Sequence, residues 1–105
     1  MKWYELEKAP DDVRSNPILV KEYVKQQGWA LKYADPIFLK DKKMVLIAVK
    51  NNGTVLEIVD DELKDDEEVV RCAVNGCFQA FKYVSERLKK NMEIIELSCR
   101  NYNGC

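Results

Sequence analysis

Hydrophobic positions recur along this chain every 25 residues, without a gap from Asn16 to Cys105. A fixed period of this length is typical of stacked repeats, in which each unit covers the apolar face of its neighbour. The main apolar columns are Val20, Val45, Val70 and Ile95; Val24, Val49, Val74 and Cys99; Leu31, Leu56 and Phe81; and Phe38, Leu63 and Leu88.

Each repeat is predicted to contain two helices. The first half begins with a capping residue, Asn16, Asp41, Asp66 or Asn91, whose side chain can accept hydrogen bonds from the first helical turn. Apolar positions then follow at i, i+1, i+4 and i+5, which makes one stripe on an α-helix rather than the alternation of a strand. The second half predicts a short helix and then a brief turn with one apolar anchor residue. The predicted fold is therefore all-α, a stack of helical hairpins that resembles an α-solenoid.

Glycines separate the two halves of the first two units. Gly28 and Gly53 follow the first helix directly, where a glycine in the left-handed conformation commonly ends a helix. In the third unit Phe78 stands in this glycine column and Gly76 comes early, so the sequence predicts a locally altered turn there.

The repeat also predicts the domain organisation. At 105 residues the chain has the size of one domain. We expect a single helical-repeat domain over residues 1–105, with full units at 16–40, 41–65 and 66–90. Residues 1–15 match the second half of a repeat and residues 91–105 match the first half, so half units are expected at both ends.

The overall charge gives little sign of a charged partner. Charged residues make up 33% of the chain, with 17 basic and 18 acidic residues, which argues against a general attraction to nucleic acid or to an anionic membrane. The N-terminal residues show no apolar stretch followed by a cleavage site, so no secretory signal is recognised and a cytoplasmic location is expected. An exported effector with another kind of signal stays possible on the sequence alone.

The four cysteines are interpreted as reduced thiols. Cys72 and Cys99 replace Val, Leu or Ile in apolar columns and so behave as small apolar residues. Cys99 is expected to be protected in the folded state. Cys77 and Cys105 replace no clear apolar column, and they are the cysteines expected to be exposed.

Two short segments resemble a known family. They are Ala48-Val49-Lys50-Asn51-Asn52-Gly53 and Ala30-Leu31-Lys32-Tyr33-Ala34-Asp35. They are similar to domain of unknown function 4116, which is marked by tandem Val-x-x-Ala-Val-x-x-Asn-Gly-x-x-Leu-x-Tyr-Ala-Ser segments. The resemblance covers residues 16–105, departs from the pattern at Tyr23 and at 75–78, and implies an all-helical repeat. It implies no activity and no functional residues.

No reaction centre is recognised in the sequence. The chain has no histidine, which removes Ser-His and Cys-His nucleophile pairs and most zinc sites. It has no glycine-rich phosphate loop, and the acidic run at 60–68 falls on capping and first-turn positions rather than on the spacing of a calcium loop. We therefore expect no enzyme activity, no metal and no cofactor.

The charged starts of the helices alternate in sign along the chain. Residues 40–43 are basic, 65–68 are acidic and 87–90 are basic. Because these segments are neighbours in a stack, we expect adjacent units to attract one another there, with Lys42 and Lys43 facing Glu67 and Glu68. One continuous basic face with aromatic side chains, as nucleic-acid binding requires, is not recognised.

Two aromatic residues are the candidates for a partner surface. Tyr4 and Trp29 share a column that Thr54 and Gln79 occupy in later units, so this column is expected to be exposed. The rings either cover the N-terminal end of the stack, which is the favoured interpretation, or form a contact surface. The expected function is a non-catalytic protein-binding or scaffolding module with an unknown protein partner. The alternatives are a repeat segment accessory to a larger enzyme or secreted effector and, third, nucleic-acid binding.

Overall fold

The computed structural model describes residues 6 and 8–100, and these residues are helical with no β-strand. The long helices are α2 (Pro17–Gln26), α3 (Lys42–Asn51), α5 (Glu67–Gly76) and α7 (Met92–Arg100). Each of the first three is followed by a 3-10 helix: η2 (Gly28–Tyr33), η4 (Gly53–Ile58) and η5 (Phe78–Tyr83). Short helices precede the long ones: α1 (Asp11–Arg14), η3 (Pro36–Lys40), α4 (Asp61–Lys64) and α6 (Glu86–Lys89).

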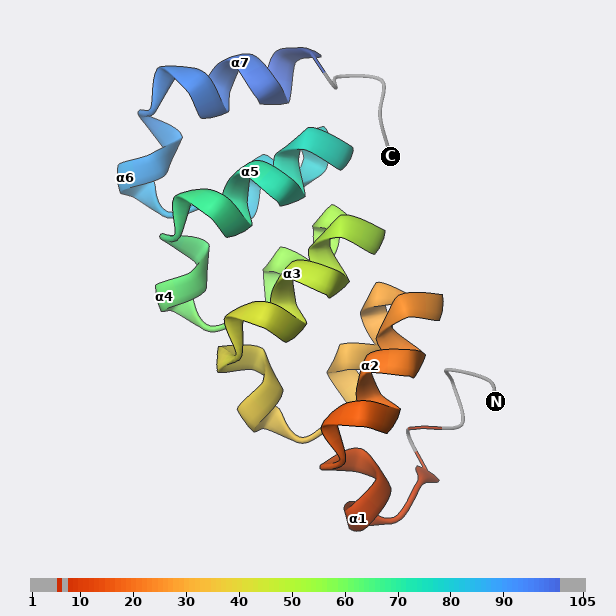
Figure 1. Cartoon of the computed structure of the whole chain (residues 1–105). Helices are drawn as coiled ribbons and strands as arrows, with labels where there is room; N and C mark the ends of the chain where they lie inside the picture. Colours follow the sequence, from red (N-terminus) through yellow and green to blue (C-terminus); the bar gives the residue numbers. More distant parts are fainter. Residues whose placement is uncertain (1–5, 7, 101–105) are drawn as a thin grey trace.

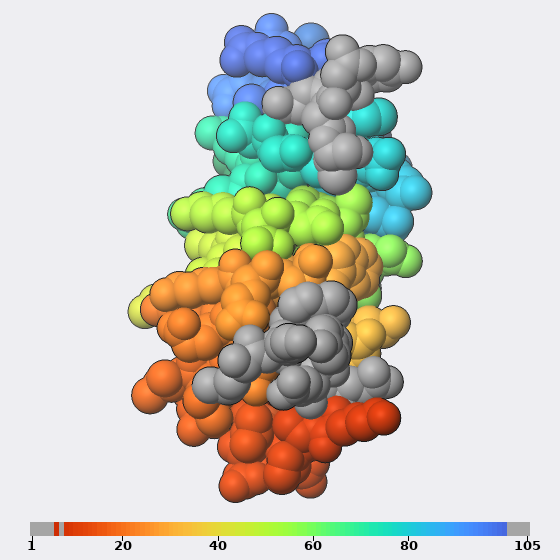
Figure 2. Space-filling view, turned by 90° about the vertical axis from the view of Figure 1, so that its right-hand side faces the viewer, coloured from red at the N-terminus to blue at the C-terminus, as the bar shows by residue number. Residues whose placement is uncertain are grey.

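The units stack in chain order and give an elongated molecule of 43 × 26 × 17 Å. The long helices α2, α3, α5 and α7 lie side by side in one layer, and the short helices run along one edge of it (Figure 1). In the space-filling view the colours form successive bands from one end to the other, so each unit contacts mainly its neighbours in the chain (Figure 2). The predicted all-α stack is confirmed.

The predicted caps begin all four long helices. The Asn16 Oδ1 atom accepts hydrogen bonds from the backbone N–H groups of Ile18 and Leu19, at 3.0 and 3.3 Å. The corresponding side-chain oxygens of Asp41, Asp66 and Asn91 accept from the same two positions of their own helices. These side chains satisfy amide groups that the helix itself leaves unpaired.

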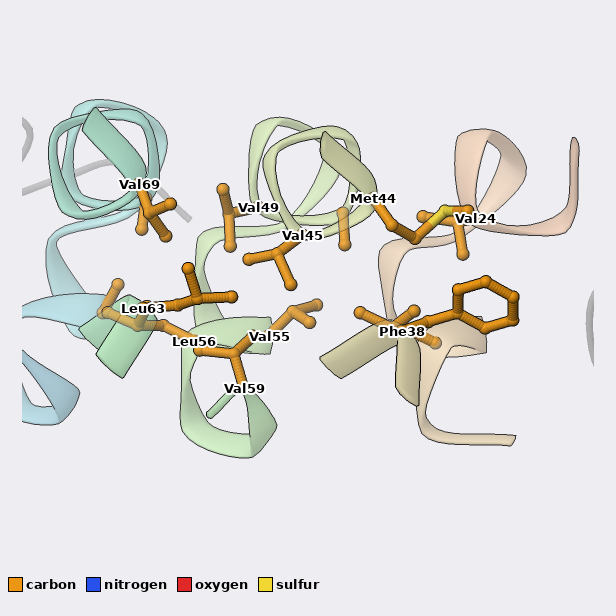
Figure 3. Packing of buried hydrophobic residues seen from close by; sticks show 14 of the residues in the cluster. Val24, Phe38, Met44, Val45, Val49, Val55, Leu56, Val59, Leu63 and Val69 are labelled. Carbon is orange, nitrogen blue, oxygen red and sulfur yellow. The ribbon is translucent and has the colours of Figure 1, made fainter. Parts of the chain in front are cut away.

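The core lies between the long helices and the layer formed by the 3-10 helices η2, η4 and η5, which we call the 3-10 layer. Figure 3 shows Val45 and Val49 of α3 directed toward Val55 and Leu56 of η4, and all four side chains are at most 1% exposed. Of the core residues predicted from the repeat, the structure confirms Leu31, Val45, Val49, Leu56, Leu63, Val70, Val74 and Leu88. Phe81 is only half-buried, so its predicted burial is wrong.

Each unit contains three helical segments rather than two. The second half is a 3-10 helix that begins with an i to i+3 hydrogen bond, from Ala30 N–H to Gln27 O in the first unit and from Val55 N–H to Asn52 O in the second. The segment predicted as a turn around Phe38, Leu63 and Leu88 is a short helix of its own. The side chains of Asp35, Asp60 and Ser85 cap these short helices.

One backbone hydrogen bond joins each short helix to the next. Asp35 N–H donates to Arg14 O at 3.0 Å, Asp60 N–H to Leu39 O at 3.1 Å, and Ser85 N–H to Lys64 O at 3.1 Å. Because donor and acceptor recur with the 25-residue period, this contact fixes the register between successive units.

The glycines serve close packing rather than a left-handed turn. Neither Gly28 nor Gly53 has a positive φ. A Cβ atom on Gly28 would lie 2.6 Å from Ala48 O, and one on Gly53 would lie 2.3 Å from Ala73 O. Each glycine therefore lets a 3-10 helix approach the carbonyl of the next long helix, and the predicted left-handed role is wrong.

Phe78 stands in the same column, and the backbone turn before it is unchanged. Cys77, which precedes it, has φ −156° and ψ 108°, close to the −151° and 108° of Asn52, so the predicted altered turn is wrong. The Phe78 side chain lines a cleft beside α7, whereas Gly28 and Gly53 make close contacts with the next long helix. This cleft of about 440 Å³ lies between η5 and Ser98 of α7, and Phe81 lines it, which explains why Phe81 is not fully buried.

The cysteines differ from the prediction in two places. Cys72 is half-buried and free, and Cys99 is free but exposed, because no 3-10 helix follows α7 among the described residues to cover it. Cys77 is 1% exposed and is not a free thiol, so its interpretation as an exposed reduced thiol is wrong. Cys105 lies outside the described residues.

Candidate functional site

Trp29 is held between two units of the stack. Its indole Nε1–H donates a hydrogen bond to the Oγ1 atom of Thr54, at 3.1 Å, one repeat further along the same column. The ring is half-buried and packs against the hydrophobic core. Tyr4, the other predicted surface residue, lies outside the described residues. These contacts give Trp29 a structural role between units, and its role in partner binding stays a prediction.

Ion pairs bridge α3 and α5 along their outer rim. The Lys42 Nζ atom lies 3.1 Å from Asp66 Oδ2 and 3.0 Å from Glu68 Oε1. Hydrogen bonds to Glu68 and Asp66 raise the pKa of Lys42. The predicted attraction between these two helix starts is thus confirmed for Lys42 and Glu68. Asp66 is the second partner of Lys42 in place of Glu67, which accepts a hydrogen bond from Asn91, and Lys43 forms no ion pair with any described residue.

Polar contacts also bridge α5 and α7. Arg71 pairs with Glu93, and the Asn91 Nδ2–H group donates to Glu67 Oε1 at 3.0 Å. At the edge of the stack, Asp65 accepts hydrogen bonds from the Ser85 hydroxyl at 2.6 Å and from Arg87 Nε–H at 3.0 Å. The Ser85 hydrogen bond, followed by that from Arg87, lowers the pKa of the Asp65 carboxyl group.

Near the C-terminal ends of α2 and α3, the Asn51 Nδ2–H group donates a hydrogen bond to Lys25 O at 3.3 Å. The groove near their N-terminal ends has no ion pair across it among the described residues. It is a cavity of about 230 Å³ with a mainly apolar lining. Ile18 stands at its rim with 73% of its surface exposed, although this column carries charged residues in all later units. We define the α2–α3 groove by its lining residues, Pro17, Ile18, Lys21, Asp41, Lys43, Met44 and Ile47.

The repeat register explains why this groove stays open. Lys21 and Lys43 stand two repeats before Arg71 and Glu93, so two lysines occupy the positions that form an ion pair between α5 and α7. Pro17 stands one repeat before Lys42 and has no charge with which to bridge the helices. The Asp41 Oδ1 atom accepts hydrogen bonds from the backbone N–H groups of Lys43 and Met44 as the cap of α3.

The columns that stay constant along the chain give no sign of the α2–α3 groove. The signal was in the columns that change. Ile18 is followed by Lys43, Glu68 and Glu93, and Lys21 is followed by Leu46, Arg71 and Glu96. An exposed isoleucine in a charged column marks a position where folding alone does not require an apolar side chain.

The described part of the chain has neither a metal-binding cluster nor a membrane-spanning helix. Within residues 6 and 8–100, no group of three or more His, Cys, Asp or Glu side chains is placed to hold a metal ion. Across the same residues, no helix has the length and apolar character needed to cross a bilayer.

The family comparison agrees with the repeat architecture. The chain matches the family described as Domain of unknown function (DUF4116) in three overlapping segments, residues 16–64, 41–89 and 66–105. Each segment begins one repeat after the one before it, and together they span residues 16–105. The chain therefore belongs to this family, as the resemblance predicted. No curated protein and no solved structure gives a significant match.

Proposed function

We propose that this protein is a non-catalytic protein-binding module and that the α2–α3 groove receives a segment of its partner. The observation that carries the proposal is the exposed Ile18 at the rim of an apolar groove, in a column that is otherwise charged. Large apolar side chains exposed beside a hollow are typical of binding surfaces. A groove between two parallel helices suits the apolar stripe of an amphipathic helix.

The stacked architecture supports the same function. Repeat stacks present extended surfaces, and their stability comes from contacts between neighbouring units, so outer positions are free to change without loss of the fold. In this chain the outer positions differ from unit to unit while the core columns stay apolar. Such variation on a constant frame is how one fold can serve different partners.

The test is a selection of helix-forming peptides from a display library on the wild-type protein. We expect enriched peptides whose affinity falls about tenfold or more in the variant Ile18→Ser, since an apolar contact in the groove is lost. The matched control is Ile37→Ser on η3, because Ile37 is 62% exposed but does not line the α2–α3 groove. Both variants should melt like the wild type.

Two results would overturn this function. One is the absence of any enriched peptide. The other is an equal loss of affinity in Ile18→Ser and Ile37→Ser, which would mean that the peptides adhere to exposed apolar side chains in general.

A further inference from the structure

Two lysines line the α2–α3 groove at the repeat positions where another interface has an ion pair. Arg71 and Glu93 join α5 to α7, and the equivalent positions between α2 and α3 hold Lys21 and Lys43. Neither lysine forms an ion pair with a residue that the structure describes. Both line the same groove as Ile18 and Ile47.

We propose that the α2–α3 groove selects an acidic amphipathic segment of a partner protein, with one carboxylate of that segment held between Lys21 and Lys43. This inference rests on the proposed function and names the chemistry of its partner. The incoming carboxylate takes the place that Glu93 occupies beside Arg71, except that it comes from another chain. It accepts hydrogen bonds from both ammonium groups.

The apolar lining of the groove indicates that the partner segment also carries apolar residues. Ile18 and the half-buried Ile47 present branched apolar surface, and Met44, which is only 5% exposed, lies in the core beneath them. A helix that carries an acidic residue one turn away from an apolar pair would contact the lysines and the isoleucines at once, since residues three or four apart share a face. Such a segment would contact both the basic and the apolar side chains of the groove.

The surroundings favour a protein segment over a nucleic acid. Phosphate backbones bind along continuous basic tracks, usually with aromatic side chains that stack on bases. Here the basic rim stops at α5, whose first turn carries Glu67 and Glu68. A nucleic-acid strand that follows Lys21 and Lys43 would meet these two carboxylates next, whereas a short acidic helix ends before it reaches them.

The experiment uses one peptide enriched on the wild-type protein and three versions of it, with Glu, Gln or Lys at the position that faces the lysines. Binding is measured by fluorescence anisotropy at low and high salt. We expect the Glu peptide to bind up to about tenfold more tightly than the Gln peptide, which corresponds to two charged contacts with exposed lysines. The Lys peptide should bind more weakly than both, and the differences should shrink in high salt.

The double variant Lys21→Glu/Lys43→Glu should reverse the order of the three peptides. The matched control is Lys32→Glu/Lys82→Glu, which makes the same change in net charge at two exposed lysines of the 3-10 layer. This control should keep the wild-type order. Circular dichroism on each variant shows that the helical fold is retained.

The possible failures can be told apart. Peptides that depend on Ile18 but prefer Gln or Lys would overturn the acidic partner and leave the proposed function standing. The absence of any Ile18-dependent peptide would overturn both. Displacement of the Glu peptide by a short single-stranded RNA at equal concentration would overturn the choice of a protein segment.

Discussion

The α2–α3 and α5–α7 interfaces use equivalent repeat positions, yet one is open at its outer rim and the other is bridged. On the inner side, α2 and α3 pack through Val20 and Val45, which are both 0% exposed, and α5 contributes Val70 in the same column. On the outer side, Arg71 pairs with Glu93 at one interface, and two lysines stand at the equivalent positions of the other.

This difference separates what folds the chain from what can give it a function. The inner columns must stay apolar because every unit buries its neighbour. Exposed ion pairs contribute only about 0–1 kcal/mol each, so a unit can lose its bridge without losing its place in the stack. Function is therefore to be sought at the outer positions where one interface departs from the others.

The largest expected effect comes from a substitution on the core face of α3, which packs against both neighbouring units. Val49 is 1% exposed, so Val49→Asp places an unpaired charge in the core and should lower the free energy of unfolding by about 4 kcal/mol or abolish folding. The control is Ile47→Asp on the groove face of the same helix, where the side chain is half-buried and the loss should be about 1–2 kcal/mol. Urea unfolding measures both. Equal losses would contradict the assignment of the two faces.

Trp29→Ala tests the role of this residue between units. We expect a loss of about 2–4 kcal/mol, because the half-buried ring leaves its packing against the core and its hydrogen bond to Thr54. Thr54→Val keeps the shape of the partner but removes the acceptor, and it should cost about 1 kcal/mol. A melting temperature unchanged in Trp29→Ala would return Trp29 to the candidates for a free contact surface.

Two glycines differ in how closely they are packed, and alanine substitutions should show the difference. Gly53→Ala should destabilise by about 1–3 kcal/mol, since the added Cβ would meet the carbonyl oxygen of Ala73 at 2.3 Å. Gly76→Ala should stabilise by about 0.5 kcal/mol, because Gly76 ends α5 with nothing within 4 Å of an added Cβ. Thermal unfolding of the two variants should therefore shift in opposite directions, and shifts of the same sign would contradict the close approach.

The repeat period makes the stack predictable from sequence, but not the details that depend on a neighbour. The columns of Val45 and Val49 and the caps such as Asp41 identify helices and their order, because these signals are local or periodic. A six-residue segment with the apolar spacing of 53–58 fits both an α-helix and a 3-10 helix. The burial of Phe81 and Cys99 depends on what covers them, and column identity carries no information about that.

The candidate site was hidden from sequence reasoning for a related reason. Aligning the repeats reveals that Ile18 departs from its column, but not that Lys21 and Lys43 line one groove with it. That juxtaposition follows only once α2 and α3 are placed side by side, and the bridge of Arg71 and Glu93 shows which contact the groove lacks.

A smaller effect concerns the bridge at the edge of the stack. The pKa of Asp65 is lowered in the folded protein, so its contribution to stability is present above its unfolded pKa of about 3.8 and is lost as the pH falls through the folded value. Asp65→Asn should therefore melt below the wild type at neutral pH and approach it in strong acid. Asp61→Asn, in the first turn of the preceding helix α4, is the control, because the Asp61 side chain is 98% exposed and its ion pair with Lys64 lies within α4 rather than between units. If the melting temperatures of the wild type and Asp65→Asn differ by the same amount at both pH values, the contribution of the Asp65 carboxylate through Ser85 and Arg87 is contradicted.

The smallest expected effect would turn the open interface into a bridged one. Lys43→Glu places a carboxylate opposite Lys21, in the arrangement that Arg71 and Glu93 have two repeats later. We expect a gain in stability of about 0.5–1 kcal/mol at low salt, which salt should screen. A negative charge near the N-terminus of α3 is also favourable by itself, because it interacts with the helix dipole. Repeating the substitution in a Lys21→Gln background separates the two contributions, since only the pairing with Lys21 disappears there. A gain of the same size in both backgrounds would mean that the two positions do not face each other, and it would remove the geometric basis for a carboxylate held between Lys21 and Lys43.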